Sequence, residues 1–217
     1  MDRLTLLFWL WMQFLAFNLI WALTQAAVAS TLGARPVGVR LGHGPALLAW
    51  RMAGIQWSFH PLILGSSVGF DEPPAQQDAP AHNRLHALPR PLHAAVIVLP
   101  WAMLVAVAMT LLGAREGLHQ FVTGFTLPFE LSALPGRIER FIGLLREGEL
   151  LRAWGLASAK AAAFNLLPLP MLAGGALLLL PWRGRMPVWA GILMALSVLC
   201  ALAFSLYVAY LTLTAIF

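Results

Sequence analysis

The chain has 217 residues, of which 60% are hydrophobic and only 11% are charged, and its mean hydropathy is +0.77. This composition excludes an ordinary soluble domain, in which about a quarter of the residues are charged. The net charge of +5 comes from 14 basic residues against nine acidic ones. The arginines lie mainly between apolar stretches, which is typical of contact with lipid headgroups rather than of nucleic-acid binding.

Four apolar stretches are long enough to cross a bilayer, because a helical span needs about 20 residues. They cover residues 4–29, 94–113, 153–180 and 188–217. The first is longer than the apolar part of a cleavable signal peptide, and no small-residue cleavage site followed by a polar chain comes after it. The sequence therefore predicts an α-helical integral membrane protein with about four transmembrane helices in a single membrane domain, residues 1–217.

The segment between the first two stretches, residues 34–93, is predicted to form a small sheet and a linker. Residues 50–60, WRMAGIQWSFH, alternate polar and apolar side chains, which is the period of a strand. PVGVRLG before it and PLILGSSV after it supply neighbouring strands, and His43 and His60 are expected to cap or line them. We expect an antiparallel sheet at the membrane surface, whose outer edge must be covered, enclosed by protein or offered to another chain. The proline-rich residues 70–91 indicate a surface linker.

The segment 114–152, on the other side of the predicted membrane, contains apolar residues at helical spacing. They are Leu134, Ile138, Phe141 and Leu145. Charged residues fill the positions between them, so we expect an amphipathic helix at the membrane interface, with an ordinary surface helix as the alternative. Near the predicted span ends, residues 34–93 and 181–187 carry five arginines against four on the other side. This narrow excess places the 34–93 loop in the cytoplasm.

The third apolar stretch contains the sequence FNLLPLPMLAGG, residues 164–175. Pro168 and Pro170 interrupt a helix, and Gly174 and Gly175 relax it again. Backbone that is not helical is tolerated at membrane depth only where protein or a water-filled cavity surrounds it. The sequence therefore predicts a broken third helix with a shaped groove at the turn. We expect Asn165 to satisfy freed backbone groups there rather than to contact a ligand.

The order of these parts resembles that of the bacterial branch of the site-2 protease family, the intramembrane zinc metalloproteases. The resemblance covers nearly the whole chain. Three stretches are similar to parts of that family: GVRLGHGPALLAWR with IQWSFHPLILGSSVGFDEP to its strand and hairpin, LPRPLHAAVIVLPWAM to the entry of its second helix, and FNLLPLPMLAGG to its N-x-x-P-x-P-x-x-D-G-G segment.

The chemistry of that family needs H-E-x-x-H on the first helix, where the two histidines share one face and hold zinc while the glutamate activates water. The ASTLGARPV segment matches the family pattern after this motif and sets the register. The motif then falls on Trp21, Ala22, Leu23, Thr24 and Gln25. The aspartate that is the third ligand corresponds to Ala173, and the second-helix asparagine to Met103. The resemblance therefore implies a pseudoprotease that binds no zinc and needs no cofactor.

A pseudoprotease of this kind is expected to bind or scaffold another membrane polypeptide, as a subunit or as an assembly or regulatory factor of a complex in the bacterial inner membrane. Substrates of the family are thought to add a strand to its hairpin, and strand addition needs no metal. The strand expected to bind the partner contains Arg51, Ile55, Gln56, Trp57, Ser58 and Phe59. The alternative is an active intramembrane metalloprotease with non-standard ligands. A small transporter is less favoured, because the chain shows no repeats.

A group of three histidines and a single lysine could each have either a structural or a functional role. His82 and His86 have helical spacing and His93 follows, but prolines surround them and no carboxylate is near, so a solvated linker is favoured over a metal site. Lys160 lies within the third apolar stretch. It is either a functional intramembrane charge or, as we favour, a side chain that extends to the interface.

The register makes one geometric prediction. Trp21 and Gln25 should face the turn between Pro168 and Gly174, with the indole filling the volume that metal and ligands would otherwise occupy.

Overall fold

The computed structural model describes residues 2–70, 85–169, 172–182 and 188–217. The helices are α1 (Arg3–Thr31), α2 (Arg90–Leu112), α3 (Ala114–Val122), α4 (Leu134–Arg146), α5 (Leu150–Asn165), α6 (Ala173–Leu179) and α7 (Val188–Ile216). Short 3-10 turns cover Leu85–Ala87, Leu127–Phe129, Leu131–Ala133 and Leu180–Trp182. The chain forms two compact units, one of residues 14–103 and one of residues 1–13 together with 104–217.

Among the described residues, three helices are long and apolar enough to cross a membrane, which is consistent with an integral membrane protein. They are α1, α2 and α7, with 29, 23 and 29 residues. The expected third span is divided into α5 and α6, of 16 and seven residues. The predicted break is therefore present, and the described chain has three continuous helices of spanning length rather than four.

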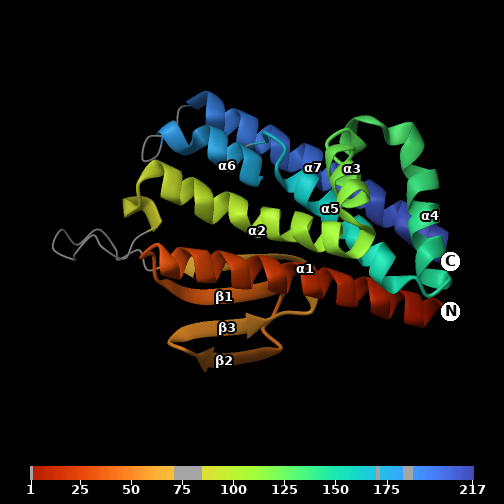
Figure 1. Ribbon diagram of the computed structural model, residues 1–217, viewed down its shortest axis with the longest axis horizontal. Coiled ribbons are helices and arrows are strands. Elements are labelled where there is room, and N and C mark those ends of the chain that lie inside the picture. The colour runs from red at the N-terminus through yellow and green to blue at the C-terminus, as the bar shows by residue number, and fades with distance from the viewer. Residues whose placement is uncertain (1, 71–84, 170–171, 183–187) are drawn as a thin grey trace. The chain divides into compact units, whose positions relative to one another are not determined.

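The predicted sheet follows α1 and has four strands, β1 (Pro36–His43), β2 (Leu48–Met52), β3 (Ile55–Phe59) and β4 (Leu62–Phe70), in the order β2-β3-β1-β4. Figure 1 shows β2, β3 and β1 side by side in that order. The prediction that the sheet is antiparallel is wrong for one of its three pairings. β1 and β3 are parallel, with Val39 opposite Trp57. The reason is that β2 and β3 form an antiparallel hairpin of which β3, not β2, pairs with β1. The chain then crosses to the other side of β1 to form β4.

The segment 50–60 is not one strand, as its alternation predicted. It contains the end of β2, a two-residue turn at Ala53 and Gly54, and β3. Both turn residues have positive φ, 52° and 80°, as the favoured turn of a two-residue hairpin requires. Because the period of two continues across this hairpin, the alternation did not reveal the turn.

Helix α1 packs on the sheet through small side chains. Figure 1 shows α1 lying along the sheet beside β1. Ala22 and Ala26 of this helix are buried in a cluster with Val39, Leu41 and Trp57. A second cluster joins the end of α1 to the start of α2 and consists of Ala29, Ala34, Leu88 and Val96. Val39 and Leu41 of β1 are buried and Arg40 between them is exposed, so the face that carries Val39 and Leu41 is the one that α1 covers.

The other unit is packed through glycines and one amphipathic helix. A Cβ atom built on Gly117 of α3 would lie 2.6 Å from the backbone of Met109 in α2, so the backbones of α3 and α2 are in direct contact. The predicted amphipathic helix is confirmed as α4. Its buried residues are Leu134, Ile138, Ile142 and Leu145, which pack with Leu6 and Ile216. Ile142 is fully buried, whereas the expected Phe141 is only partly buried.

Candidate functional site

The positions of α1 to which the resemblance assigns the H-E-x-x-H motif carry mostly apolar groups. Ala22 is 0% exposed and lies against the sheet. The ring of Trp21 packs against that of Trp101, with centroids 5.9 Å apart. Among the described residues, the buried Trp21 Nε1 and Gln25 Oε1 atoms have no hydrogen-bond partner. A neutral amide and two apolar residues give this face of α1 no strong donor to a divalent metal ion.

The buried histidine His60 makes hydrogen bonds that hold parts of the sheet together. His60 is buried, with Nδ1 2.7 Å from the Gly44 carbonyl oxygen and Nε2 3.1 Å from Ser58 Oγ. It therefore ties the β1–β2 connection to the end of β3, and its predicted role in lining the sheet is confirmed. His82 and the side chain of His86 lie outside the described residues. Within the described part of the chain, no three His, Cys, Asp or Glu side chains form a group that could hold a metal ion.

Strand β2 forms one edge of the sheet, and all five of its residues are exposed. Leu48, Trp50 and Met52 are 60%, 38% and 54% exposed. Trp50 lies opposite Trp57 in the register, and the two rings stack with centroids 6.1 Å apart. These three apolar side chains therefore share the face of the sheet that α1 covers elsewhere. β2 combines an open backbone edge with an apolar strip.

The residues predicted to bind a partner strand are not all at this edge. Arg51 lies on β2, but Ile55, Gln56, Trp57, Ser58 and Phe59 form β3, which pairs with β2 on one side and β1 on the other. An interior strand has no free backbone edge. The hairpin at residues 53–54 moves these five residues inward, so within residues 48–59 the strand with a free backbone edge is β2, and β4 forms the opposite edge of the sheet.

The turn that begins at Asn165 separates α5 from α6. The Asn165 amide donates to the Ala161 carbonyl at 2.9 Å, and the Leu169 N–H donates to the Leu167 carbonyl across Pro168 at 2.8 Å. The second bond closes a three-residue turn that cannot continue a helix.

Gly174 allows α6 to begin directly against this turn. A Cβ atom at Gly174 would lie 2.2 Å from the Leu166 carbonyl oxygen and 2.4 Å from that of Leu167. Gly174 and Gly175 are both buried. Ala173, the first residue of α6, offers no polar side-chain atom, and Pro170 lies outside the described residues.

Some predicted neighbours belong to different compact units. Trp21, Gln25 and Met103 lie in the unit of residues 14–103, whereas the turn and Ala173 lie in the other. The contact between Trp21 and the turn therefore stays a prediction. Met103 lies on α2 and is 46% exposed.

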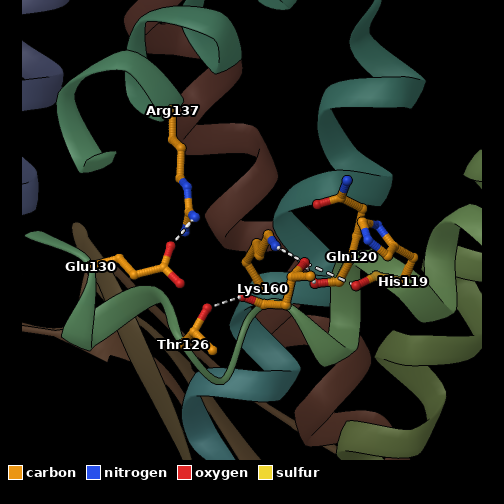
Figure 2. A network of polar contacts seen from close by, with 7 residues as sticks. His119, Gln120, Thr126, Glu130, Arg137 and Lys160 are labelled. Carbon is orange, nitrogen blue, oxygen red and sulfur yellow. Dashed lines mark hydrogen bonds and ion pairs between the residues drawn. The ribbon is translucent and has the colours of Figure 1, made fainter. Parts of the chain in front are cut away.

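Lys160 belongs to a polar network whose other members the sequence did not indicate (Figure 2). Its Nζ donates to Thr123 Oγ1 at 2.8 Å, and Thr123 Oγ1 donates to the His119 carbonyl at 2.9 Å. Thr126 Oγ1 donates to the Thr123 carbonyl at 3.1 Å. The ammonium group of α5 therefore holds the turn that follows α3.

An ion pair between Glu130 and Arg137 lies in the same network (Figure 2). The pKa of the Glu130 carboxyl lies below its ordinary value of 4.5. The largest cause is the Thr126 hydroxyl, which is within reach of this carboxylate as well as of the Thr123 carbonyl. Burial opposes the shift, and the positive charges of Arg137 and Lys160 add to it. The only signal in the sequence was the single lysine in an apolar stretch, because its partner is 37 positions away.

Comparison with protein-family models and with curated proteins found no match to this chain.

Proposed function

We propose that this chain is a non-catalytic, site-2-protease-like membrane protein that holds another membrane polypeptide along strand β2, as a subunit or as an assembly or regulatory factor of a membrane complex. The observation that carries the proposal is the exposed edge strand β2, whose apolar residues Leu48, Trp50 and Met52 extend the α1-covered face of the sheet. An open edge next to lipid is costly unless another chain completes it.

The register identifies which backbone groups of β2 are available. In a two-residue hairpin, the residues that flank the turn, here Met52 and Ile55, form a pair that exchanges hydrogen bonds, and the next pair does not. Ala49 and Arg51 belong to the second kind of pair. Their N–H and C=O groups are therefore expected to point outward, where a partner strand could bind them by main-chain hydrogen bonds.

The absence of catalysis is supported by the residue types at the three expected ligand positions. Trp21 and Ala173 offer a metal no lone pair, and Gln25 offers only a neutral amide oxygen. A weak neutral donor does not offset the desolvation of a divalent ion in apolar surroundings.

The test of partner binding is a photo-crosslinking amino acid at Leu48 in the full chain in its native membrane. We expect one companion membrane polypeptide in the crosslinked product. Arg51→Pro removes the outward donor and should reduce the crosslink at least fivefold, whereas Arg51→Ala keeps the N–H and should leave it unchanged. Equal crosslinking by both variants would exclude edge pairing at β2.

Metal analysis separates the proposal from an active metalloprotease. Protein purified without metal and then reloaded with zinc should retain no stoichiometric zinc, iron or cobalt. One tightly held ion per chain that is lost on Gln25→Ala or on His86→Ala would overturn the non-catalytic proposal. It would also identify the site that holds the ion.

A further inference from the structure

A hollow of about 560 Å³ lies among α3, α4, α5 and the end of α2, all within one compact unit. This volume is in the range of small-molecule sites. We name it the α4 hollow. It is lined by Leu112, Glu116, Gln120, Gly136, Glu139, Arg140, Gly143, Leu144, Glu147, Arg152 and Leu156. Its lining thus combines three carboxylates, two guanidinium groups and three leucines.

Two glycines of α4 keep the hollow open. Gly136 and Gly143 line it, and a Cβ atom at either would meet nothing within 4 Å. They differ from the buried Gly117 and Gly174, where a Cβ atom would collide with backbone. A glycine inside a helix costs about 1 kcal/mol relative to alanine. Packing within the described chain does not require glycine at either position, and a larger side chain there would extend into the hollow.

The charges of the hollow are only partly used within the described chain. Glu116 accepts from Gln120 at 2.7 Å, and Arg152 pairs with Glu149 at 3.1 Å. Among the described residues, neither the Glu139 nor the Glu147 carboxylate has a hydrogen-bond or ion-pair partner. Carboxylates therefore remain available on the same helix face as a guanidinium group.

Arg140 provides that guanidinium group. Its Nε donates to the Gly136 carbonyl at 3.1 Å, which leaves its two terminal nitrogens for a ligand within the described part of the chain. Arg140, Gly143 and Glu147 are spaced three and four residues apart, so they lie along one face of α4.

We propose that the α4 hollow binds the headgroup of a phospholipid that carries both a phosphate and a primary ammonium, such as phosphatidylethanolamine. The phosphate binds the free edge of the Arg140 guanidinium, and the ammonium donates to Glu139 and Glu147. An anionic headgroup fits less well, because carboxylates outnumber guanidinium groups in the lining.

A choline headgroup fits less well for a different reason. It has no N–H to donate, and proteins bind quaternary ammonium groups with aromatic side chains. Among the residues that the structure describes, no aromatic side chain lines the hollow.

The leucines that line the hollow indicate where the lipid tails would lie. Leu112 is the last residue of α2, which is long and apolar enough to cross a membrane. The hollow therefore begins where an apolar helix ends, which is the level of the headgroups if α2 spans the bilayer. Leu112, Leu144 and Leu156 offer apolar surface next to the charged groups.

The test measures the unfolding midpoint of the purified full chain in mild detergent with soluble six-carbon-chain lipids, read by its nine tryptophans. Dihexanoyl phosphatidylethanolamine should raise the midpoint in a saturable way. The matched phosphatidylcholine and phosphatidylglycerol, and inorganic phosphate, should bind at least tenfold more weakly. An equal response to phosphatidylcholine, or to phosphate alone, would overturn the proposal.

Three variants tie the effect to the hollow. Gly143→Leu fills it and should abolish the lipid shift while keeping or raising the midpoint without lipid, because leucine is a better helix former. Gly191→Leu in α7, where a Cβ atom also meets nothing within 4 Å, should keep the lipid shift. Glu139→Gln combined with Glu147→Gln adds no volume and should weaken binding at least tenfold. Unchanged preference for ethanolamine in that double variant would overturn the proposal even if Gly143→Leu fails to fold.

Discussion

The sheet of residues 36–70 and the helical segment of residues 114–179 are packed by opposite means. In the sheet, a large side chain covers small ones, since Trp57 is 5% exposed and lies against Ala22 and Ala26 of α1. In the helical segment, backbones approach each other where side chains are missing. A Cβ atom at Gly124 would lie 2.5 Å from the Ala163 Cβ, and one at Gly155 would lie 2.8 Å from Leu112 Cγ.

This difference determines which substitutions each region tolerates. A sheet that depends on the volume of one indole loses stability when volume is removed. A helical segment that depends on missing side chains loses stability when volume is added. The polar network of Lys160 and Glu130 belongs to the helical segment, so sensitivity to charge and pH should be found there as well.

The largest effect is expected from removing volume in the sheet. Trp57→Ala should lower the free energy of unfolding by about 3–5 kcal/mol, because it leaves a cavity between β3 and α1. The matched change Trp50→Ala affects a 38% exposed ring at the edge and should cost less than half as much. Denaturant unfolding in detergent, followed by circular dichroism, measures both. Equal losses of unfolding free energy in the two variants would show that the exposed Trp50 ring stabilises the sheet as much as the buried Trp57 ring. The sheet would then not depend on one buried indole.

The second effect comes from adding volume in the helical segment. Gly174→Ala should destabilise the chain by about 1–3 kcal/mol, because its Cβ atom would lie 2.2 Å from the Leu166 carbonyl oxygen and the turn would have to move. The control is Gly191→Ala in α7, where a Cβ atom meets nothing within 4 Å. It should be neutral or stabilising by up to about 1 kcal/mol. The same denaturant unfolding experiment compares the two, and a neutral Gly174→Ala would mean that the turn moves aside at little cost in free energy.

The spacing of apolar residues, together with the positions of prolines and glycines, predicted much of this fold. Apolar length predicted α1, α2 and α7, and the proline and glycine positions predicted the break between α5 and α6. The alternation of residues 50–60 predicted strands but not the hairpin at Ala53 and Gly54. Strand order could not be predicted, because the alternation of a strand specifies its buried face and not its neighbour.

Two parts of the candidate sites left no periodic signal. The Lys160 network depends on hydroxyls and carbonyls of an irregular turn, 37 positions away in the chain. The α4 hollow depends on Gly136 and Gly143, which look like ordinary helix-weakening glycines in the sequence. Only the structure separates glycines that touch a neighbour from glycines that face open space.

A smaller effect is expected from the polar tie between α5 and the turn after α3. A double-mutant cycle with Lys160→Met and Thr123→Val should give a coupling energy of about 1–2 kcal/mol, because a charged donor bonds a hydroxyl at 2.8 Å. The control cycle pairs Lys160→Met with Thr110→Val, whose hydroxyl bonds the Ala106 carbonyl of its own helix. That pair should be additive. Additivity of Lys160 and Thr123 would show that their contact adds nothing to stability.

The smallest effect is a pH dependence at Glu130, which again separates the two regions because residues 36–70 contain no aspartate or glutamate. The pKa of this carboxyl is lowered in the folded state, first by the Thr126 hydroxyl and then by the charges of Arg137 and Lys160. A carboxyl with a lowered folded pKa binds fewer protons when folded than when unfolded. Its contribution is therefore complete above about its ordinary value of 4.5 and is lost as the pH falls through the folded pKa.

Glu130→Gln removes this titration without changing the shape of the side chain. The difference in unfolding midpoint between the wild-type chain and Glu130→Gln should be constant from pH 7 to about pH 5 and should shrink as the pH falls to 3. The difference should be small, because the Glu130 side chain is 42% exposed and solvent screens its charge. Thr126→Val removes the largest cause of the shift, so in that background the decline should be smaller and should end at a higher pH. A difference that grows on acidification would mean that the folded state raises the pKa of Glu130, and that the hydroxyl and the two cations do not stabilise its charge.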